Sequence, residues 1–340
     1  ISELLQSNDL RVGVNKSPHL MSPRERIRAD SEDISDSDYS RLESRIENLD
    51  LDFSFFEKLT VMAFQYFSDQ DVDYAVMEVG MGGRLDATNA AENDYAVITN
   101  IGRDHSEYLG DTKEEIAAEK AGIIPEDGVL ITNCDEKAIV EKSEDQNCSI
   151  HRPNSVKHFS DELFYAGESF SLPVKGEFQK ENLMTALKTV EVIEELPESI
   201  ERALENLECE GRLQKIQEKP LVVLDGAHNQ KAVEKISREM PSDFVCVFNC
   251  TEEKEAAGMI KALADRCSSF IFTKSKIKWS AEPEQLAELT QKKSIVAKEP
   301  MKALGKAQEI AGEEGSILVT GSLYLIGNIL EELQSSNKDS

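Results

Sequence analysis

Short segments that are apolar on both faces alternate in this chain with segments of helical period, and the alternation recurs in two separate series. In the first series, the segments YAVMEV, YAVIT and GVLIT are interspersed with two helices, whose capping boxes pair Ser54 with Glu57 and Thr112 with Glu115. A strand without a polar face must be covered by helices on both sides, as in parallel sheets. The chain is therefore predicted to have an α/β fold with mostly parallel sheets.

The second series begins near Pro220 and contains the predicted strands LVVLD, FVCVFN, FIFT and SILVTG, separated by helical segments. A chain of 340 residues with 40% hydrophobic content is more typical of two domains than of one. We expect a first domain over residues 1–210 and a smaller, Rossmann-like α/β domain over residues 211–340.

Two stretches depart from this alternation of strands and helices. Short polar segments over residues 143–171 indicate antiparallel strands, and the acidic, serine-rich residues 28–40 indicate a flexible loop.

Charge and composition exclude several classes of protein. The formal net charge of −27 argues against binding to nucleic acid, whose phosphates are bound by clustered lysine and arginine. The sequence has no apolar run as long as a membrane span and no signal-peptide pattern, and its six cysteines form no Cys-x-x-Cys pair. We expect a cytoplasmic protein with no membrane partner and reduced cysteines. The acidity is typical of a protein from a salt-rich cytoplasm, and an ordinary acidic cytosolic protein is the alternative.

The stretch MEVGMGGRLDATN, residues 77–89, places Glu78 at the end of an apolar strand, with three glycines just beyond it. Burying an unpaired carboxylate costs on the order of several kcal/mol, so a cation or hydrogen-bond donors are expected to meet Glu78. Ligands of doubly wound sheets bind at the carboxyl ends of strands, and His105 follows the next predicted strand. We therefore expect Glu78 and His105 to share a divalent cation across neighbouring strand ends. A tight turn with a satisfied carboxylate is the alternative.

Further motifs carry a resemblance to a known family. They are EVGMGGRLDATN, ITNIGRDHSEYLGDTKEEIAAEKAGI, GEFQKENLMTAL, GRLQ, LDGAHN and VTGSLYLIG, in this order after the SPHL motif. Together they resemble the folylpolyglutamate synthase / dihydrofolate synthase family, a branch of the Mur ligases. The resemblance implies a P-loop-type, ATPase-like first domain followed by a glutamate ligase domain. It also implies ATP-dependent amide formation, in which a substrate carboxylate is phosphorylated and the amino group of L-glutamate attacks the acyl phosphate.

The resemblance further implies a metal and a modified lysine. Glu78, His105 and Lys120 match catalytic positions, and Ser17, Glu78 and His105 match the ligands of Mg²⁺. This ion is usually held by a small number of protein groups, and water and phosphate oxygens complete its coordination. Lys120 matches a lysine that carries a carbamate, which would replace a cation that repels the metal by an anion that attracts it. An ordinary lysine on a helix surface is the alternative for Lys120.

The positions at which the family binds ATP and substrate also have matching residues in this sequence. Those for ATP are Gln179, Asn182, Arg212, Asp225 and His228, and those for the pterin-bearing substrate are Phe55, Phe56, Glu57, Leu85 and Asp86. Lys16, Arg24, Arg26 and Arg28 form a cationic stretch in an acidic chain, and from it we expect Arg24 to contact an anionic substrate. The alternatives are an interdomain salt bridge for Arg212, a helix cap for Asp225 and core packing for the two phenylalanines.

One family motif has no counterpart. The family has a Gly-x-x-Gly-Lys-[Ser/Thr] P-loop before SPHL, and this sequence has none. Residue 1 is Ile, and residues 1–14 resemble the helix and strand that follow such a loop, so we expect a truncated sequence. The favoured function is a monomeric, Mg²⁺- and ATP-dependent ligase that joins L-glutamate to dihydropteroate, to folate polyglutamates or to both. The alternatives are a Mur-type ligase for another carboxylate substrate and a nucleotide-binding remnant without catalysis.

Overall fold

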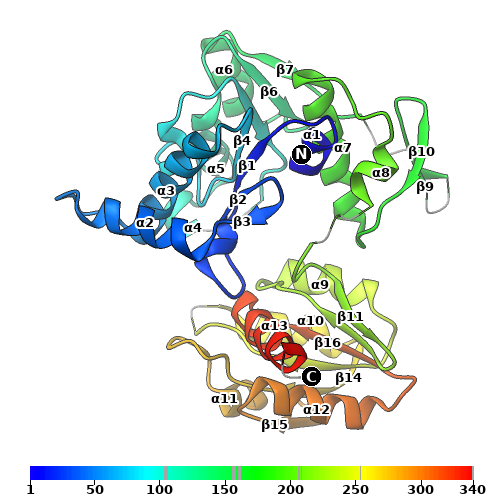
Figure 1. The fold of residues 1–340 in the computed structure, drawn as a ribbon. Coiled ribbons are helices and arrows are strands. Elements are labelled where there is room, and N and C mark those ends of the chain that lie inside the picture. The colour runs from blue at the N-terminus through cyan, green and yellow to red at the C-terminus, as the bar shows by residue number, and fades with distance from the viewer. Residues whose placement is uncertain are drawn as a thin grey trace. The chain divides into compact units, whose positions relative to one another are not determined.

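The computed structural model describes residues 1–102, 106–154, 158–159, 162–205, 207, 209–252 and 254–338. The predicted α/β class is confirmed, because helices and parallel-rich sheets build the chain (Figure 1). The chain divides into two compact units, Ile1–Pro173 with Glu177–Leu207 and Val174–Gly176 with Glu208–Ser340. In the described part of the chain, no helix is both long and apolar enough to span a membrane.

The described strands of the first unit form separate sheets. One has the order β3-β2-β1-β4, with β3 Glu32–Asp33, β2 Ile27–Ala29, β1 Val12–Asn15 and β4 Tyr74–Met77. Within it, β1 and β4 are parallel and the other pairs are antiparallel. The sheet β5-β6-β7 is parallel throughout and comprises Tyr95–Ile98, Val129–Thr132 and Ser149–His151. The sheet β10-β9-β8 is antiparallel and comprises Glu168–Ser171, Glu162–Tyr165 and His158–Phe159.

Two helices of the first unit, α3 and α5, begin at the predicted caps. In chain order the helices are α1 Ser2–Gln6, η1 Pro23–Arg26, α2 Asp36–Glu47, α3 Phe55–Gln70, η2 Ala87–Ala90, α4 Ser106–Leu109, α5 Lys113–Lys120, η3 Ala121–Ile123, α6 Lys137–Asp145, α7 Glu177–Ile193 and α8 Ile200–Leu204. Both predicted capping boxes are confirmed: the Glu57 N–H donates to Ser54 Oγ at 3.3 Å, and the Glu115 N–H donates to Thr112 Oγ1 at 3.2 Å. The segment FFE therefore opens α3, and α5 ends at Lys120.

Residues 28–40 do not form the expected flexible loop. They contribute to β2, to β3 and to the first turns of α2. Ser35 caps α2 by accepting a hydrogen bond from the Asp38 N–H at 3.0 Å, and acidic side chains in the first turn complement the positive end of the helix. Leu42 and Ile46 are buried among residues of α3. The acidity of this stretch is thus divided between the strand β3, with Glu32 and Asp33, and the first turn of α2, with Asp36 and Asp38.

Residues 143–171 form the expected antiparallel strands only in part. Helix α6 extends to Asp145, and β7 pairs in parallel with β6, whereas β8, β9 and β10 are antiparallel as predicted. The Ser143 hydroxyl donates to the Ile139 carbonyl at 2.8 Å inside α6. A polar side chain can be accommodated in a helix in this way, which is why composition alone misplaced the boundary.

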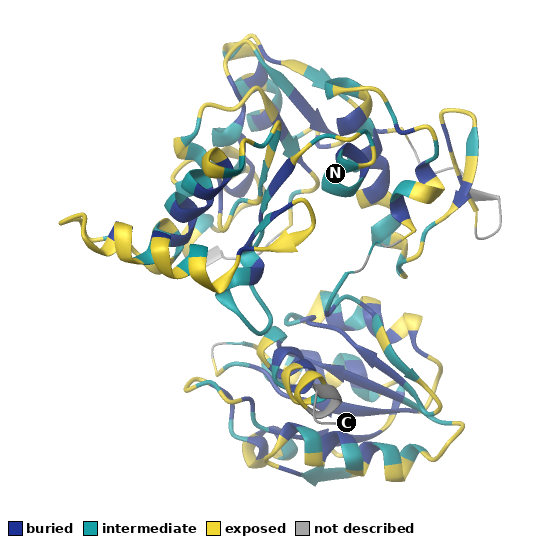
Figure 2. Cartoon of the chain, viewed as in Figure 1, coloured by how far each residue is buried: buried dark blue, intermediate teal, exposed yellow. Residues whose placement is uncertain are grey.

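The second unit has one six-stranded sheet in its described residues, with the order β11-β12-β16-β13-β14-β15. The strands are β11 Gln214–Glu218, β12 Leu221–Leu224, β13 Phe244–Phe248, β14 Cys267–Phe272, β15 Ser294–Val296 and β16 Ser316–Thr320, and only the edge strand β11 is antiparallel to its neighbour. Helices α9 Gln230–Glu239, α10 Ala256–Ala264, α11 Pro283–Glu288, α12 Pro300–Ala311 and α13 Leu323–Lys338 alternate with the strands. The central strands are buried (Figure 2), as the apolar runs predict, while β11 and β15 were not predicted.

Candidate active site

A backbone donor meets Glu78 at the carboxyl ends of β1 and β4. These strands are parallel, with Asn15 opposite Met77, so the residues that follow them lie side by side. The Glu78 N–H donates to the Asn15 carbonyl oxygen at 2.8 Å. The Glu78 carboxylate accepts a hydrogen bond from the backbone N–H of Ser17 at 2.5 Å. The structure thus brings Ser17 and Glu78 together.

Two of the three expected metal ligands can be compared with the chemistry of Mg²⁺. His105 lies outside the described residues, so its approach to Glu78 stays a prediction. Within the described ranges, no group of three or more His, Cys, Asp and Glu side chains is arranged to hold a metal ion. Ser17 and Glu78 carry a hydroxyl and a carboxylate, hard oxygen donors of the kind that Mg²⁺ prefers. These residues therefore fit a magnesium ion that is held mainly by water and phosphate oxygens.

The glycine-rich turn after Glu78 is packed against the end of α5. A Cβ atom on Gly83 would lie 2.8 Å from the carbonyl oxygen of Glu119, which leaves no room for any side chain. The Arg84 N–H donates to the same carbonyl at 2.9 Å, and the Arg84 guanidinium pairs with the Glu119 carboxylate at 2.9 Å. The turn is therefore fixed beside the residue that ends α5, Lys120.

Glu78 and Lys120 line one cavity of about 800 Å³, whose sides are residues 73–79 and 94–100. These two segments contain β4 and β5, which belong to different sheets. The two strands are therefore not hydrogen-bonded to each other, and the expected approach of Glu78 and His105 across neighbouring strand ends stays a prediction. Lys120 is half-buried at the wall of this cavity.

A second cavity, of about 610 Å³, shares Gly82 with the first. Five of the residues predicted to bind substrate or metal line it: Ser17, Phe56, Glu57, Leu85 and Asp86. Its apolar side chains are unusually accessible, since Leu85 is 79% exposed and Tyr108 is 74% exposed. Exposed apolar groups gathered around a concave surface mark a ligand site in preference to core packing.

The loop that carries Leu85 is held by Asp86. The Asp86 carboxylate accepts hydrogen bonds from the Met81 N–H at 2.9 Å, from the Thr88 N–H at 3.0 Å and from the Thr88 hydroxyl at 2.6 Å. Phe55 is 54% exposed, so it is not a core residue, whereas Phe56 is half-buried and lines the cavity. The FFE segment and this loop therefore contribute to one surface.

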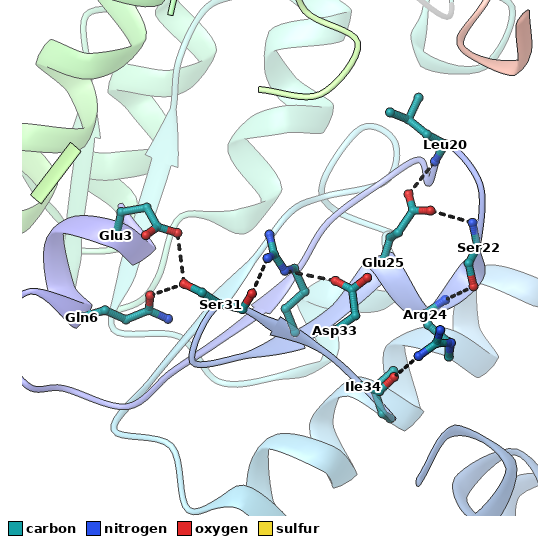
Figure 3. Close-up of polar contacts among 10 residues, drawn as sticks. Glu3, Gln6, Leu20, Ser22, Arg24, Glu25, Ser31, Asp33 and Ile34 are labelled. Atoms are coloured by element: carbon teal, nitrogen blue, oxygen red, sulfur yellow. Dashed lines mark hydrogen bonds and ion pairs between the residues drawn. The ribbon is translucent and has the colours of Figure 1, made fainter. Parts of the chain in front are cut away.

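Arg24 and Arg26 leave the cationic loop in different directions. The Arg24 guanidinium pairs with Asp36 at 3.0 Å and donates to the Ile34 carbonyl at 3.0 Å (Figure 3), and Arg24 is not among the lining residues of either cavity. Arg26 lines the smaller cavity instead. Ser22 and Glu25 form a capping box for the short helix η1, where two positions span two thirds of a turn. The sequence SPRE, residues 22–25, has the spacing of a capping box and so predicts this short helix. A helix there would have indicated that the side chains of Arg24 and Arg26 point in different directions.

Three of the residues expected to bind ATP gather at the carboxyl end of β12. The Asp225 carboxylate accepts hydrogen bonds from the N–H groups of Leu213 and Ala227, both at 2.8 Å, and burial raises its pKa. Arg212 lies close enough for its charge to oppose that rise, and His228 Nδ1 lies 3.0 Å from the Gly226 carbonyl oxygen. Asn229 caps α9, so the helix-cap alternative for Asp225 is wrong.

Gln179 and Asn182 belong to the first unit, on helix α7. They lie one turn apart, and the Asn182 side-chain amide donates to Gln179 Oε1 at 3.1 Å. The two amides therefore form one polar group on the first turns of α7.

Comparison with known proteins agrees with this arrangement. Residues 46–190 match the Mur ligase middle domain, and residues 211–323 match the Mur ligase glutamate ligase domain. A dihydrofolate synthase/folylpolyglutamate synthase from Bacillus subtilis is 30% identical over an alignment that covers 98% of this chain and 86% of the relative. This chain belongs to the folylpolyglutamate synthase and dihydrofolate synthase family.

Solved structures of the same family have similar folds. Escherichia coli FolC in complex with DHPP and ADP superposes with a TM-score of 0.88 at 26% identity, over 98% of this chain and 84% of that one. A bifunctional folylpolyglutamate synthase/dihydrofolate synthase with Mn, AMPPNP and L-glutamate bound gives a TM-score of 0.84 at 25% identity, over 97% of this chain and 84% of that one. The predicted Mur-ligase fold is confirmed.

Proposed function

We propose that this chain is an ATP-dependent ligase that joins L-glutamate to dihydropteroate, to folate polyglutamates or to both. The observation that carries the proposal is the continuity between the cavity of about 610 Å³ and Glu78: Ser17 lines that cavity, and its N–H holds the Glu78 carboxylate. A flat, partly apolar ring system suits the wall formed by Phe56, Leu85 and Tyr108. A carboxylate on the same substrate would then reach toward Glu78.

The proposed reaction has two steps. Substrate carboxylate attacks the γ-phosphorus of ATP to give an acyl phosphate and ADP, and the L-glutamate nitrogen then attacks the acyl carbon, so that an amide forms and phosphate leaves. Ser17, Glu78 and His105 would hold Mg²⁺, which supplies positive charge against the phosphate oxygens when bound. Arg212 is proposed to oppose phosphate charge through its guanidinium.

The remaining assignments belong to the same proposal. The polar groups of Gln179, Asn182, Asp225 and His228 are proposed to contact the nucleotide, and Phe55, Glu57 and Asp86 to frame the substrate surface. For Lys120 we propose the carbamate that the family resemblance implies; its half-buried position in the lining of the cavity that Glu78 also lines supports it. The protein is proposed to act as a cytoplasmic monomer, with residues 1–210 as the ATPase-type domain and residues 211–340 as the glutamate ligase domain.

The space between β4 and β5 supports a proposal for the P-loop. β4 pairs with β1 and β5 pairs with β6, and on the sides that face the cavity neither strand has a partner among the described residues. Parallel strands with open edges are unusual, because their N–H and C=O groups stay unpaired. We propose that one further parallel strand, leading into a Gly-x-x-Gly-Lys-[Ser/Thr] loop, lies in this space. An in-frame sequence of that form upstream of the Ile1 codon is expected, and its lack would favour the remnant without catalysis.

An acceptor-dependent assay tests the proposed function. The protein expressed from its whole reading frame is expected to release ADP only when L-glutamate and an acceptor, dihydropteroate or tetrahydrofolate, are both present. If neither acceptor supports ADP release, the proposal is contradicted and a Mur-type ligase for another carboxylate substrate is favoured. The comparison of the two acceptors also decides between dihydrofolate synthase, folylpolyglutamate synthase and a bifunctional enzyme.

A further inference from the structure

Arg26 is the only cation among the described residues that line the cavity of about 610 Å³. The other charged groups of the lining are the carboxylates of Glu57, Asp86 and Glu119. Carboxylates repel an anionic substrate, whereas a guanidinium attracts one and can bind a carboxylate through two parallel hydrogen bonds. Arg26 is therefore the lining residue whose chemistry suits an anionic group of the substrate.

Contacts with two aromatic side chains fix the Arg26 guanidinium. Its Nε–H donates to His19 Nδ1 at 2.8 Å, and its central carbon lies 5.6 Å from the centre of the Phe55 ring. His19 also packs edge-on against Phe55 with ring centroids 6.4 Å apart. A guanidinium held in this way loses little freedom when it binds a ligand.

The backbone that carries Arg26 is held as firmly as the side chain. The buried Glu25 carboxylate accepts hydrogen bonds from the N–H groups of Leu20 and Ser22 at 2.7 and 2.6 Å (Figure 3). It also accepts one from the Met21 N–H at 2.9 Å. The Lys16 N–H donates to the Arg26 carbonyl at 3.0 Å. Since Lys16 precedes Ser17, one braced loop carries both the group that meets Glu78 and the cation of the substrate cavity.

We propose that Arg26 binds the carboxylate of a terminal glutamate that is not extended, and so selects glutamylated acceptors over dihydropteroate. The inference rests on the proposed function. A folate-type acceptor ends in a glutamate with two carboxylates: one must react near Ser17 and Glu78, and the second lies a few bonds away. Dihydropteroate has a single carboxylate, which must react, so it has none left for Arg26.

Equilibrium binding of two stable analogues tests this role without turnover. Pteroylglutamate and pteroate share the ring system and differ by one glutamyl residue. We expect Arg26→Gln to weaken binding of pteroylglutamate by about 10- to 100-fold, because a charge-assisted contact is lost, and to change pteroate binding less than about twofold. Arg26→Lys, which keeps the charge without the planar fork, should fall between the two.

Arg28→Gln is the matched control. Arg28 lies two residues further along, pairs with Asp33 at 3.1 Å and lines neither cavity, so neither affinity should change. Retained pteroate binding shows that the Arg26 variant is folded. Equal weakening of both ligands by Arg26→Gln in a folded protein, or no weakening of either, would overturn the proposal. If the unmodified protein binds neither pteroylglutamate nor pteroate, that result counts against the proposed function itself.

Discussion

Individual hydrogen bonds define the candidate site more closely than any cluster of charged groups. Glu78 is held by the Ser17 N–H and Asp225 by the N–H groups of Leu213 and Ala227. Glu78 follows β4, whose parallel partner β1 leads to Ser17, and Asp225 follows β12, whose antiparallel partner β11 begins directly after Leu213. The positions of these carboxylates therefore follow from strand pairing, and the chemistry of the site depends on single side chains that a substitution can remove.

Glu78→Gln is expected to reduce glutamate-dependent ADP release by about 100-fold or more in the protein from the whole reading frame, because a neutral amide does not offset the charge of magnesium. The amide oxygen can still accept from the Ser17 N–H, so the unfolding midpoint should change little. Rates are measured at saturating Mg²⁺. Near-full turnover of the variant under that condition would exclude Glu78 as a metal ligand.

Lys120→Ala is expected to abolish ligase activity, with partial rescue by a small carboxylic acid that can enter the vacated space. The physical reason is that a carbamate, unlike an ammonium group, adds an anion beside the metal. Lys113→Ala is the control on the same helix. Lys113 is exposed and lines neither cavity, so its loss should leave ligase activity nearly unchanged. Equal and mild losses at both positions would remove the carbamate from the mechanism.

At the scale of elements, local signals were predictable and long-range pairing was not. The caps of α3 and α5 depend on residues three positions apart, so Ser54 with Glu57 and Thr112 with Glu115 were readable from the sequence. The start of α2 was missed because acidic residues suit both a solvated loop and a helix N-terminus. Whether β4 and β5 pair depends on what lies between them, which no periodicity within either strand records.

The same limit applies to the substrate cavity. Leu85 and Asp86 were located through their motif, whereas the contribution of Tyr108 depends on the fold that brings the end of α4 to the glycine-rich turn. Arg24 and Arg26 are both basic and only two residues apart, and their separation follows from the short helix η1. Motifs thus gave the chemistry of the site, and tertiary packing decides which side chains share a cavity.

Gly83→Ala is expected to destabilise the first unit by about 1–3 kcal/mol and to reduce activity, because its Cβ would clash with the Glu119 carbonyl and displace the turn beside Lys120. Gly305→Ala is the comparison, since Gly305 lies in α12 with open space where its Cβ would be. That variant should gain about 0.5–1 kcal/mol from better helix propensity. Urea unfolding measures both changes, and equal effects at the two positions would contradict the packing argument.

At the scale of the whole molecule, the net charge of −27 is the dominant electrostatic property. Like charges repel one another in a compact chain, and salt screens that repulsion over a Debye length of about 10 Å at 0.1 M and about 3 Å at 1 M. Raising KCl from about 0.1 M to about 1 M is therefore expected to raise the urea midpoint of unfolding. A midpoint that falls on addition of KCl would show that screened ion pairs outweigh the repulsion.

The two units together are expected to perform one amide-forming reaction, and the mass of the product tests this most directly. The protein from the whole reading frame is incubated with ATP, Mg²⁺, L-glutamate and either dihydropteroate or tetrahydrofolate. The predicted result is an acceptor extended by one glutamyl residue, with one ADP released per amide bond formed. ADP release without any glutamylated product, or an unchanged mass for both acceptors, would contradict the account.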